Sequence, residues 1–211
     1  MPARADYRKK LQNILDNLVI MCRHAEDICE QSVAAFVARD LELAQNVKKI
    51  EKTIDKLERK IEKASLRLLV MEHPVASDFH EISVALKIVI DLERIGDQAK
   101  DIAKITAQLT DAPVPESIKQ MGVIVIHMLK DAVRSYVNRD LELARLLDKT
   151  DDKVDAIFDI IMNELAAAIQ KNPENSKNAL QLIMVAKYLE RIGDHAVNIG
   201  ERVEKLIQGK I

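Results

Sequence analysis

The sequence predicts an all-α fold of two tandem, pseudo-repeated antiparallel three-helix bundles, with six long helices in all. Apolar residues recur at alternating steps of three and four, which is the pattern of long, packed helices. Aromatic residues make up only 3% of the 211 residues and no alternation of period two persists, so strands are not expected. Two short motifs occur twice in the same order, so each half of the chain should repeat one layout.

The first predicted helix ends near Arg39 and Asp40. Its apolar seam consists of Tyr7, Leu11, Ile14, Leu18, Met21, Ala25 and Ile28. Asp40 can cap the second helix, which ends before Pro74. The seam of that helix consists of Val47, Ile50, Ile54, Leu57, Ile61, Ala64, Leu68 and Met71. The third helix follows the turn at Pro74 and carries the hexapeptide LERIGD at residues 92–97.

The second half of the chain repeats these features. The motif RDLELA occurs at residues 39–44 and 139–144, and LERIGD recurs at residues 189–194. The fourth helix should therefore end at Arg139, the fifth should extend from the cap Asp140 to the turn at Pro173, and the sixth should carry the second LERIGD. Residues 110–116 (TDAPVPE) form the expected joint between a first bundle at 1–112 and a second at 113–211. A solenoid is the weaker alternative, because two copies fall short of the three or more that stacked arrays need.

Composition and charge exclude several classes of protein. Acidic residues (34) and basic residues (32) nearly cancel to a net charge of −2, so we expect no direct DNA binding. No run approaches the roughly 20 apolar residues that span a bilayer, and no secretory signal is visible. Cys22 and Cys29 lie too far apart on one predicted helix for a disulfide. These observations predict a cytoplasmic protein.

Acidic residues form four pairs within the repeats, each with its members four residues apart. The pairs are Glu51/Asp55, Glu93/Asp97, Asp151/Asp155 and Glu190/Asp194. Side chains four residues apart lie on one helix face, where two negative charges repel. All four pairs share one phase relative to the apolar seam, and each lies about 20 residues, or about 30 Å, from its turn. Because the helices that flank each turn run antiparallel, each half should gather its two pairs into a cluster of four carboxylates.

A cluster of four ionised carboxylates requires protons or a bound cation. Oxygen ligands suit Mg²⁺, Ca²⁺, Mn²⁺ or iron, and Zn²⁺ remains possible although its usual Cys and His signatures are absent. We therefore predict that all eight acids are metal ligands, with Asp101 as a secondary ligand whose counterpart in the second half is Asn198. The alternative is a solvated helix face on which acids pair with nearby bases, for example Asp97 with Lys100.

Other chemically active patterns are missing from the sequence. No glycine-rich nucleotide-binding loop occurs, and neither cysteine has a plausible His or Asp relay nearby, so we predict no catalytic residue. Gly96 and Gly193 lie in mid-helix, where a glycine costs about 1 kcal/mol relative to alanine. Their positions on the seam predict close helix packing.

The doubled LERIGD, with its E-x-x-x-D acids, and the tandem three-helix halves resemble the PhoU family of phosphate-signalling proteins over nearly the whole chain. The resemblance implies a cytoplasmic negative regulator that links the Pst phosphate transporter, through its ATPase, to a sensor histidine kinase. It implies an adaptor without catalytic activity, which meets the membrane only through partners and forms a possible homodimer. It also implies metal ions or clusters, such as Fe, Mn, Mg or Zn, on the eight acids named above.

Three alternatives remain open at this stage. Clustered carboxylates that hold two metals can activate water, so a metal-dependent phosphohydrolase is possible. The chain could instead regulate a different ion transporter. A purely structural helical scaffold would hold no metal at all.

Overall fold

The computed structural model describes residues 2–72, 74–109 and 113–209, and these residues form six long α-helices. The helices are α1 (Pro2–Ala38), α2 (Leu41–Glu72), α3 (Ala76–Thr106), α4 (Glu116–Asn138), α5 (Leu141–Lys171) and α6 (Ser176–Gln208), with a short 3₁₀ turn η1 (Pro173–Asn175) before α6. The described residues contain no strand, and the predicted all-α fold of six helices is confirmed. None of the helices in these ranges is both long and apolar enough to cross a membrane.

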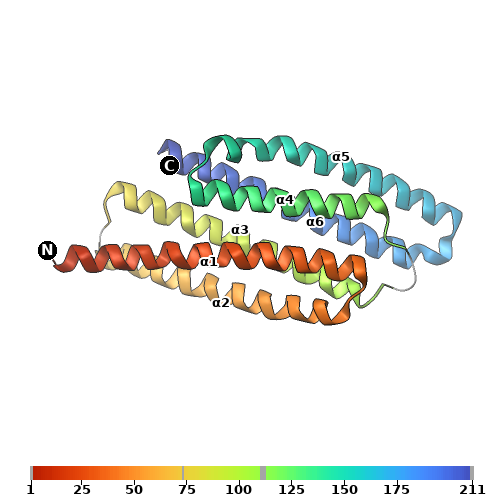
Figure 1. The fold of residues 1–211 in the computed structure, drawn as a ribbon, viewed down its shortest axis with the longest axis horizontal. Helices are drawn as coiled ribbons and strands as arrows, with labels where there is room; N and C mark the ends of the chain where they lie inside the picture. The colour runs from red at the N-terminus through yellow and green to blue at the C-terminus, as the bar shows by residue number, and fades with distance from the viewer. Residues whose placement is uncertain (1, 73, 110–112, 210–211) are drawn as a thin grey trace.

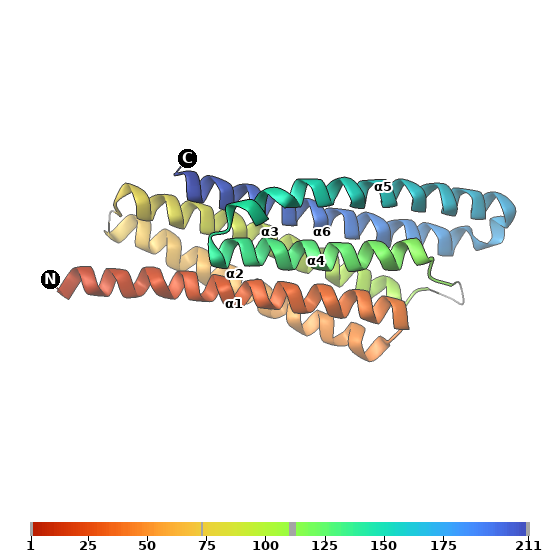
Figure 2. The same ribbon diagram turned by 45° about the horizontal axis from the view of Figure 1, so that its top comes forward.

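The helices form two antiparallel three-helix bundles that lie side by side (Figures 1 and 2). Helices α1, α2 and α3 pack on one another, and so do α4, α5 and α6. The bundles meet through α3 against α6 and α1 against α4, whereas α2 and α5 lie at the outer edges. The predicted boundary at 112/113 falls between α3 and α4, and because residues 110–112 lie outside the described residues it stays a prediction.

The turn before the middle helix of each half is built in the same way. Arg39 and Arg139 adopt left-handed backbone conformations, with φ of 55° and 53°, and end the preceding helix. Asp40 Oδ1 then accepts hydrogen bonds from the amides of Glu42 and Leu43 at 2.9 Å each. Asp140 accepts from the amide of Leu143 at 3.0 Å. Both predicted caps are therefore confirmed.

The predicted apolar seam of α2 is right near its start and wrong at two positions toward its end. Val47, Ile54, Ile61 and Leu68 are buried as predicted, but Ala64 is exposed and Ser65 is buried in its place. Met71, also assigned to the seam, is 66% exposed. A straight helix drifts by roughly 20° per heptad relative to a repeat of 3.5 residues. Over a helix of this length that drift moves the buried face by one residue.

A buried polar network joins the two halves. Asp91 on α3 is only 3% exposed, and it accepts a hydrogen bond from Arg202 Nε on α6 at 2.6 Å. His195 Nδ1 lies 3.1 Å from the same carboxylate. Asp91 directly precedes the first LERIGD and His195 directly follows the second, so the two hexapeptides lie at the same level of the molecule.

Both cysteines are free and buried, in agreement with the expected absence of a disulfide. Burial raises the pKa of Cys22 and of Cys29 to about 12, so neither forms a thiolate at neutral pH. Cysteine chemistry therefore plays no part in the site described next.

Candidate metal centre

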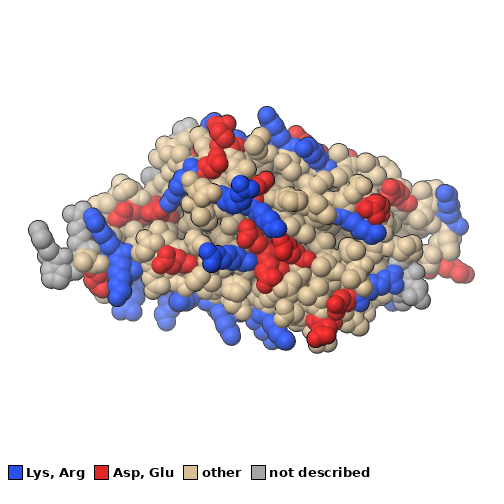
Figure 3. Space-filling view, viewed as in Figure 1, with Lys and Arg blue, Asp and Glu red and all other residues tan. Residues whose placement is uncertain are grey.

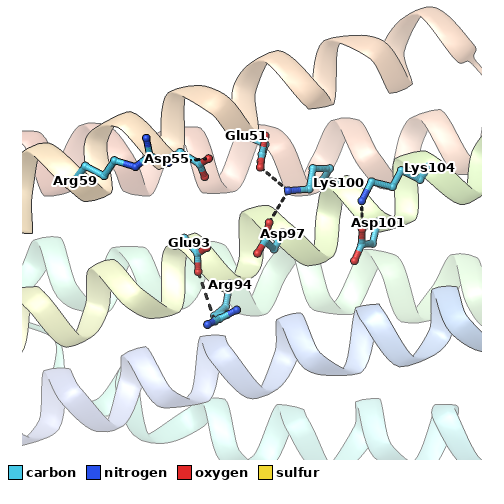
Figure 4. A network of polar contacts seen from close by, with 9 residues as sticks. All are labelled: Glu51, Asp55, Arg59, Glu93, Arg94, Asp97, Lys100, Asp101 and Lys104. Atoms are coloured by element: carbon cyan, nitrogen blue, oxygen red, sulfur yellow. Dashed lines mark hydrogen bonds and ion pairs between the residues drawn. The ribbon is translucent and has the colours of Figure 1, made fainter.

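The structure brings the predicted ligands of the first half together at the seam between α2 and α3 (Figure 4). This first-half cluster consists of Glu51 and Asp55 on α2 with Glu93 and Asp97 on α3. Partial burial, followed by the charges of Glu51 and Asp97, raises the pKa of Asp55. Partial burial and the charge of Asp97 likewise raise the pKa of Glu93. The four carboxylates therefore sense one another across the two helices.

A lysine neutralises the centre of this cluster. Lys100 lies one turn beyond Asp97 on α3, and its Nζ donates to Asp97 Oδ1 at 2.6 Å. The same ammonium donates to Glu51 Oε1 on α2, so it bridges the two helices. Partial burial acts to lower the pKa of Lys100, but its hydrogen bonds to Asp97 and Glu51 outweigh that effect and raise the pKa above the ordinary lysine value.

The other acids of the first half turn toward separate bases. Asp55 lies 4.0 Å from Arg59, and Glu93 lies 3.5 Å from Arg94. Asp101, the predicted secondary ligand, pairs with Lys104 at 2.6 Å, one turn away from the cluster (Figure 4). The acids of the first half therefore lie beside bases, as the alternative to metal binding predicts. The expected pair of Asp97 with Lys100 is one of these pairs.

The second-half cluster consists of Asp151 and Asp155 on α5 with Glu190 and Asp194 on α6. Partial burial, together with the charges of Asp155 and Asp194, raises the pKa of Asp151 to about 6. The same kinds of cause, loss of solvent and the charge of Glu190, raise the pKa of Asp194. These couplings show that the structure brings the four predicted ligands of the second half together as well.

Asp151 lacks a partner for one of its oxygens. Its Oδ1 is buried and accepts no hydrogen bond from the residues that the structure describes. A Cβ atom added at Gly193 would lie 3.1 Å from this oxygen, so the glycine makes room for the carboxylate. At the corresponding Gly96 a Cβ atom would instead meet Ile54 Cδ1 at 3.2 Å. Close packing at both glycines is confirmed, but only Gly193 supports a member of a cluster.

The base that pairs with the second-half cluster, Lys187, lies at its edge. Lys187 Nζ binds Glu190 at 2.6 Å, on the same helix, and lies 5.6 Å from the centre of the Phe158 ring. Within the described part of the chain, no Lys or Arg forms an ion pair with Asp151, Asp155 or Asp194. Among the described residues of the second half, no Lys or Arg joins the cluster carboxylates of α5 to those of α6, although Arg145 on α5 pairs with Glu204 on α6 outside the cluster at 2.9 Å.

The sequence contains a signal for this difference that the pattern of acidic pairs alone missed. When the repeats are aligned on their acids, Val197 takes the place of Lys100. Along the middle helix of each half, Lys48, Lys52 and Arg59 of α2 are replaced in α5 by three aspartates, Asp148, Asp152 and Asp159. Lys and Arg side chains accordingly line the edge of the molecule along α2 (Figure 3). The acids repeat between the halves, but the bases around them do not.

The two clusters differ in how well they fit a metal ion. Among the described residues, no three His, Cys, Asp or Glu side chains are arranged as a ready metal site. The second-half cluster nevertheless offers four carboxylates, a buried oxygen without a partner and no bridging ammonium, which is a donor set that suits a hard cation. In the first half the ammonium of Lys100 already lies between the carboxylates. Metal binding itself stays a prediction.

Comparisons with known proteins match almost the entire chain. The family model described as the PhoU domain matches residues 18–106 and 118–203, one copy in each half. A protein from Clostridium acetobutylicum named phosphate-specific transport system accessory protein PhoU homolog is 35% identical over 211 residues, which cover 98% of this chain and 96% of that protein. The crystal structure of PhoU from Pseudomonas aeruginosa has a TM-score of 0.92 at 32% identity, covering 97% of this chain and 100% of the other. A phosphate transport system regulatory protein PhoU from Streptococcus pneumoniae shares the fold, with a TM-score of 0.88 at 24% identity and coverage of 97% and 98%.

Proposed function

Because this chain belongs to the PhoU family, we propose that it regulates phosphate transport as a cytoplasmic adaptor without catalytic activity. It restrains phosphate uptake and phosphate-starvation signalling by linking the transporter's ATPase to a sensor histidine kinase. The observation that carries this proposal is the match, over nearly the full length of both chains, to a relative named as an accessory protein of phosphate-specific transport. That match favours phosphate over another transported ion as the regulated species.

The proposal includes a metal ion at the carboxylate clusters. Asp151, Asp155, Glu190 and Asp194 would hold it in the second half. Glu51, Asp55, Glu93 and Asp97, with Asp101 nearby, are the corresponding acids of the first half. A bound divalent ion supplies positive charge and open coordination positions for oxygen ligands of a partner. The carboxylates converge from two helices each, so they would hold the ion at a fixed place on the surface that a partner meets.

The position of the clusters favours an adaptor over a phosphohydrolase. Both clusters lie at helix seams on the outside of the bundles, whereas a hydrolase encloses its substrate beside the metal. A hollow of about 820 Å³ lies at the start of α1 and the α2–α3 turn, and its lining includes Glu72, Asp78 and Glu81 but no carboxylate of either cluster. Turnover of phosphate esters with added Mn²⁺, lost in Asp194→Asn, would instead support the hydrolase.

A genetic experiment tests the regulatory role. In the source organism, loss of the gene should switch on a phosphate-starvation reporter in phosphate-rich medium, and the wild-type gene should restore repression. An unchanged reporter would contradict the proposed regulation.

Binding of the purified transporter ATPase and of the kinase's cytoplasmic part, measured with Mn²⁺ and with EDTA, tests the role of the metal. Unchanged binding in EDTA would remove the metal from the proposal, and sedimentation of the purified chain tests the proposed homodimer.

A further inference from the structure

We infer that Lys100 is a built-in cation that closes the first-half cluster to metal ions, so that metal binding is confined to the second-half cluster. This inference rests on the proposed metal binding and assigns it to one half of the molecule. It follows from the position of one side chain, from the partners of the acids around it and from the comparison that the internal repeat provides.

The ammonium of Lys100 lies where a bound metal ion would have to lie. It bridges Glu51 on α2 and Asp97 on α3, the two helices whose carboxylates would have to share an ion. The side chain of Lys100 is only 23% exposed and that of Glu51 only 10%, so neither can turn freely into solvent. A divalent ion on the same oxygens would be repelled by the ammonium, and a lysine keeps its proton at neutral pH.

The remaining acids of the first-half cluster, Asp55 and Glu93, do not form a separate metal site. Glu93 lies 3.5 Å from Arg94 and Asp55 lies 4.0 Å from Arg59, so both basic side chains reduce the negative charge available to a metal ion. Figure 4 shows Glu93 directed toward Arg94 and away from the bridge at Lys100, whereas the carboxylate of Asp55 lies on the side of Glu51. The first-half cluster is therefore neutralised by residues of the chain itself.

The second half serves as an internal control. Val197, a partly buried apolar residue, stands where the repeat would place Lys100, and among the described residues no ammonium joins a cluster carboxylate of α5 to one of α6. Asp151 keeps a buried oxygen without a hydrogen-bond partner. The same backbone layout thus presents four carboxylates twice, and within the described part of the chain only the first copy has a cation that bridges the cluster carboxylates of its two helices.

The inference is tested by counting metal ions in the full chain and its variants. Wild type, Lys100→Met and the matched control Lys104→Met are equilibrated with Mn²⁺, desalted and measured by elemental analysis, and Mn²⁺ affinity is measured by calorimetry. Lys104 also pairs with an acid one turn back on α3, Asp101, but bridges no second helix. Lys100→Met should about double the Mn²⁺ bound per chain, because a second four-carboxylate site opens, and Lys104→Met should leave it unchanged.

A background that lacks the second-half cluster separates the possible outcomes. Asp151→Asn/Asp155→Asn should bind no Mn²⁺ while Lys100 is present, and adding Lys100→Met should restore binding. Stoichiometric Mn²⁺ in that background with Lys100 intact would overturn the inference. So would a folded Lys100→Met or Lys100→Gln protein that gains no Mn²⁺, with circular dichroism as the check on folding.

Failure of the proposed function gives a different pattern. If wild type binds no metal but Lys100→Met gains it, the role of Lys100 stands and the proposed metal site of the second half is lost. If metal binds as expected but the phosphate-starvation reporter ignores loss of the gene, the metal assignment stands and the regulatory proposal is lost.

Discussion

The first-half and second-half clusters occupy equivalent positions in the repeat, but only the first-half carboxylates are bridged by a basic side chain among the described residues. In the first half, Lys100 donates to carboxylates on both helices. In the second half, no described Lys or Arg links the carboxylates in this way, and partial burial with the charges of the neighbouring acids raises the pKa of Asp151 to about 6. The comparison shows that the two repeats keep the acids at equivalent positions but differ in the basic residues around them. These basic residues determine the net charge of each cluster and therefore which ligands it can bind.

The largest effect that separates the clusters should come from removing their lysines. In metal-free protein, Lys100→Met should lower the free energy of unfolding by about 2 kcal/mol, less than for a fully buried ion pair because the lysine is 23% exposed. Lys187→Met should lower it by only about 0.5 kcal/mol, because Lys187 is 42% exposed and pairs with an acid of its own helix. Urea unfolding in EDTA measures both values. Equal losses would show that the two clusters are neutralised in similar ways.

A smaller, pH-dependent effect should appear at Asp151. Its pKa is raised to about 6 in the folded protein, whereas an unfolded aspartate titrates near about 4. Between these values the folded state binds the extra proton, so stability falls as pH rises, and the penalty is complete above about pH 6. In EDTA, Asp151→Asn should therefore exceed wild type by about 1–2 kcal/mol near neutral pH and match it near pH 4.

The matched control for this effect is Asp152→Asn, an exposed neighbour on the same helix. Because this side chain is exposed, Asp152→Asn should change the free energy of unfolding near neutral pH by less than about 0.5 kcal/mol. If Asp151→Asn gained no more stability than Asp152→Asn near neutral pH, the repulsion inferred at the second-half cluster would be absent.

A third comparison uses the two glycines of the repeated hexapeptide. Gly193→Ala places a Cβ atom 3.1 Å from Asp151 Oδ1, so the carboxylate must shift, and the affinity for Mn²⁺ should fall about tenfold. Gly96→Ala meets Ile54 instead and should leave the affinity unchanged. Titration calorimetry measures both. Equal affinities for the two variants would mean that Gly193 does not position a ligand.

The smallest effect is expected at Asp101, whose counterpart is Asn198. Asp101 forms a pair with Lys104, whose side chain is 49% exposed, so Asp101→Asn should change stability by less than about 0.5 kcal/mol. It should also leave the metal content unchanged. A loss of bound metal would instead support Asp101 as the secondary ligand that the sequence predicts.

The sequence predicted the helices, the caps and the gathering of the acids because these depend on local periodicity. Repeated spacing fixes the phase of Glu51 or Asp151 on its helix, and antiparallel pairing then sets which faces meet. Ala64 and Met71 of the α2 seam were predicted wrongly because the heptad count ignores the gradual drift of a straight helix, which buries Ser65 in place of Ala64.

The partners of the charged side chains were harder to predict. Spacing on α3 indicated the pair of Lys100 with Asp97, but it could not show that the same ammonium reaches Glu51 on another helix. The contact of His195 and Arg202 with Asp91 likewise joins residues more than a hundred positions apart. Tertiary packing determines which of several nearby acids a long basic side chain contacts. The residue pattern of a single helix carries no information about that packing.

The most direct test is an anomalous difference map from crystals of the wild-type protein grown with Mn²⁺. A peak is expected beside Asp151, Asp155, Glu190 and Asp194, with none between Lys100, Glu51 and Asp97. Equal peaks in both halves, or a peak beside Lys100 alone, would contradict the division of roles between the two clusters.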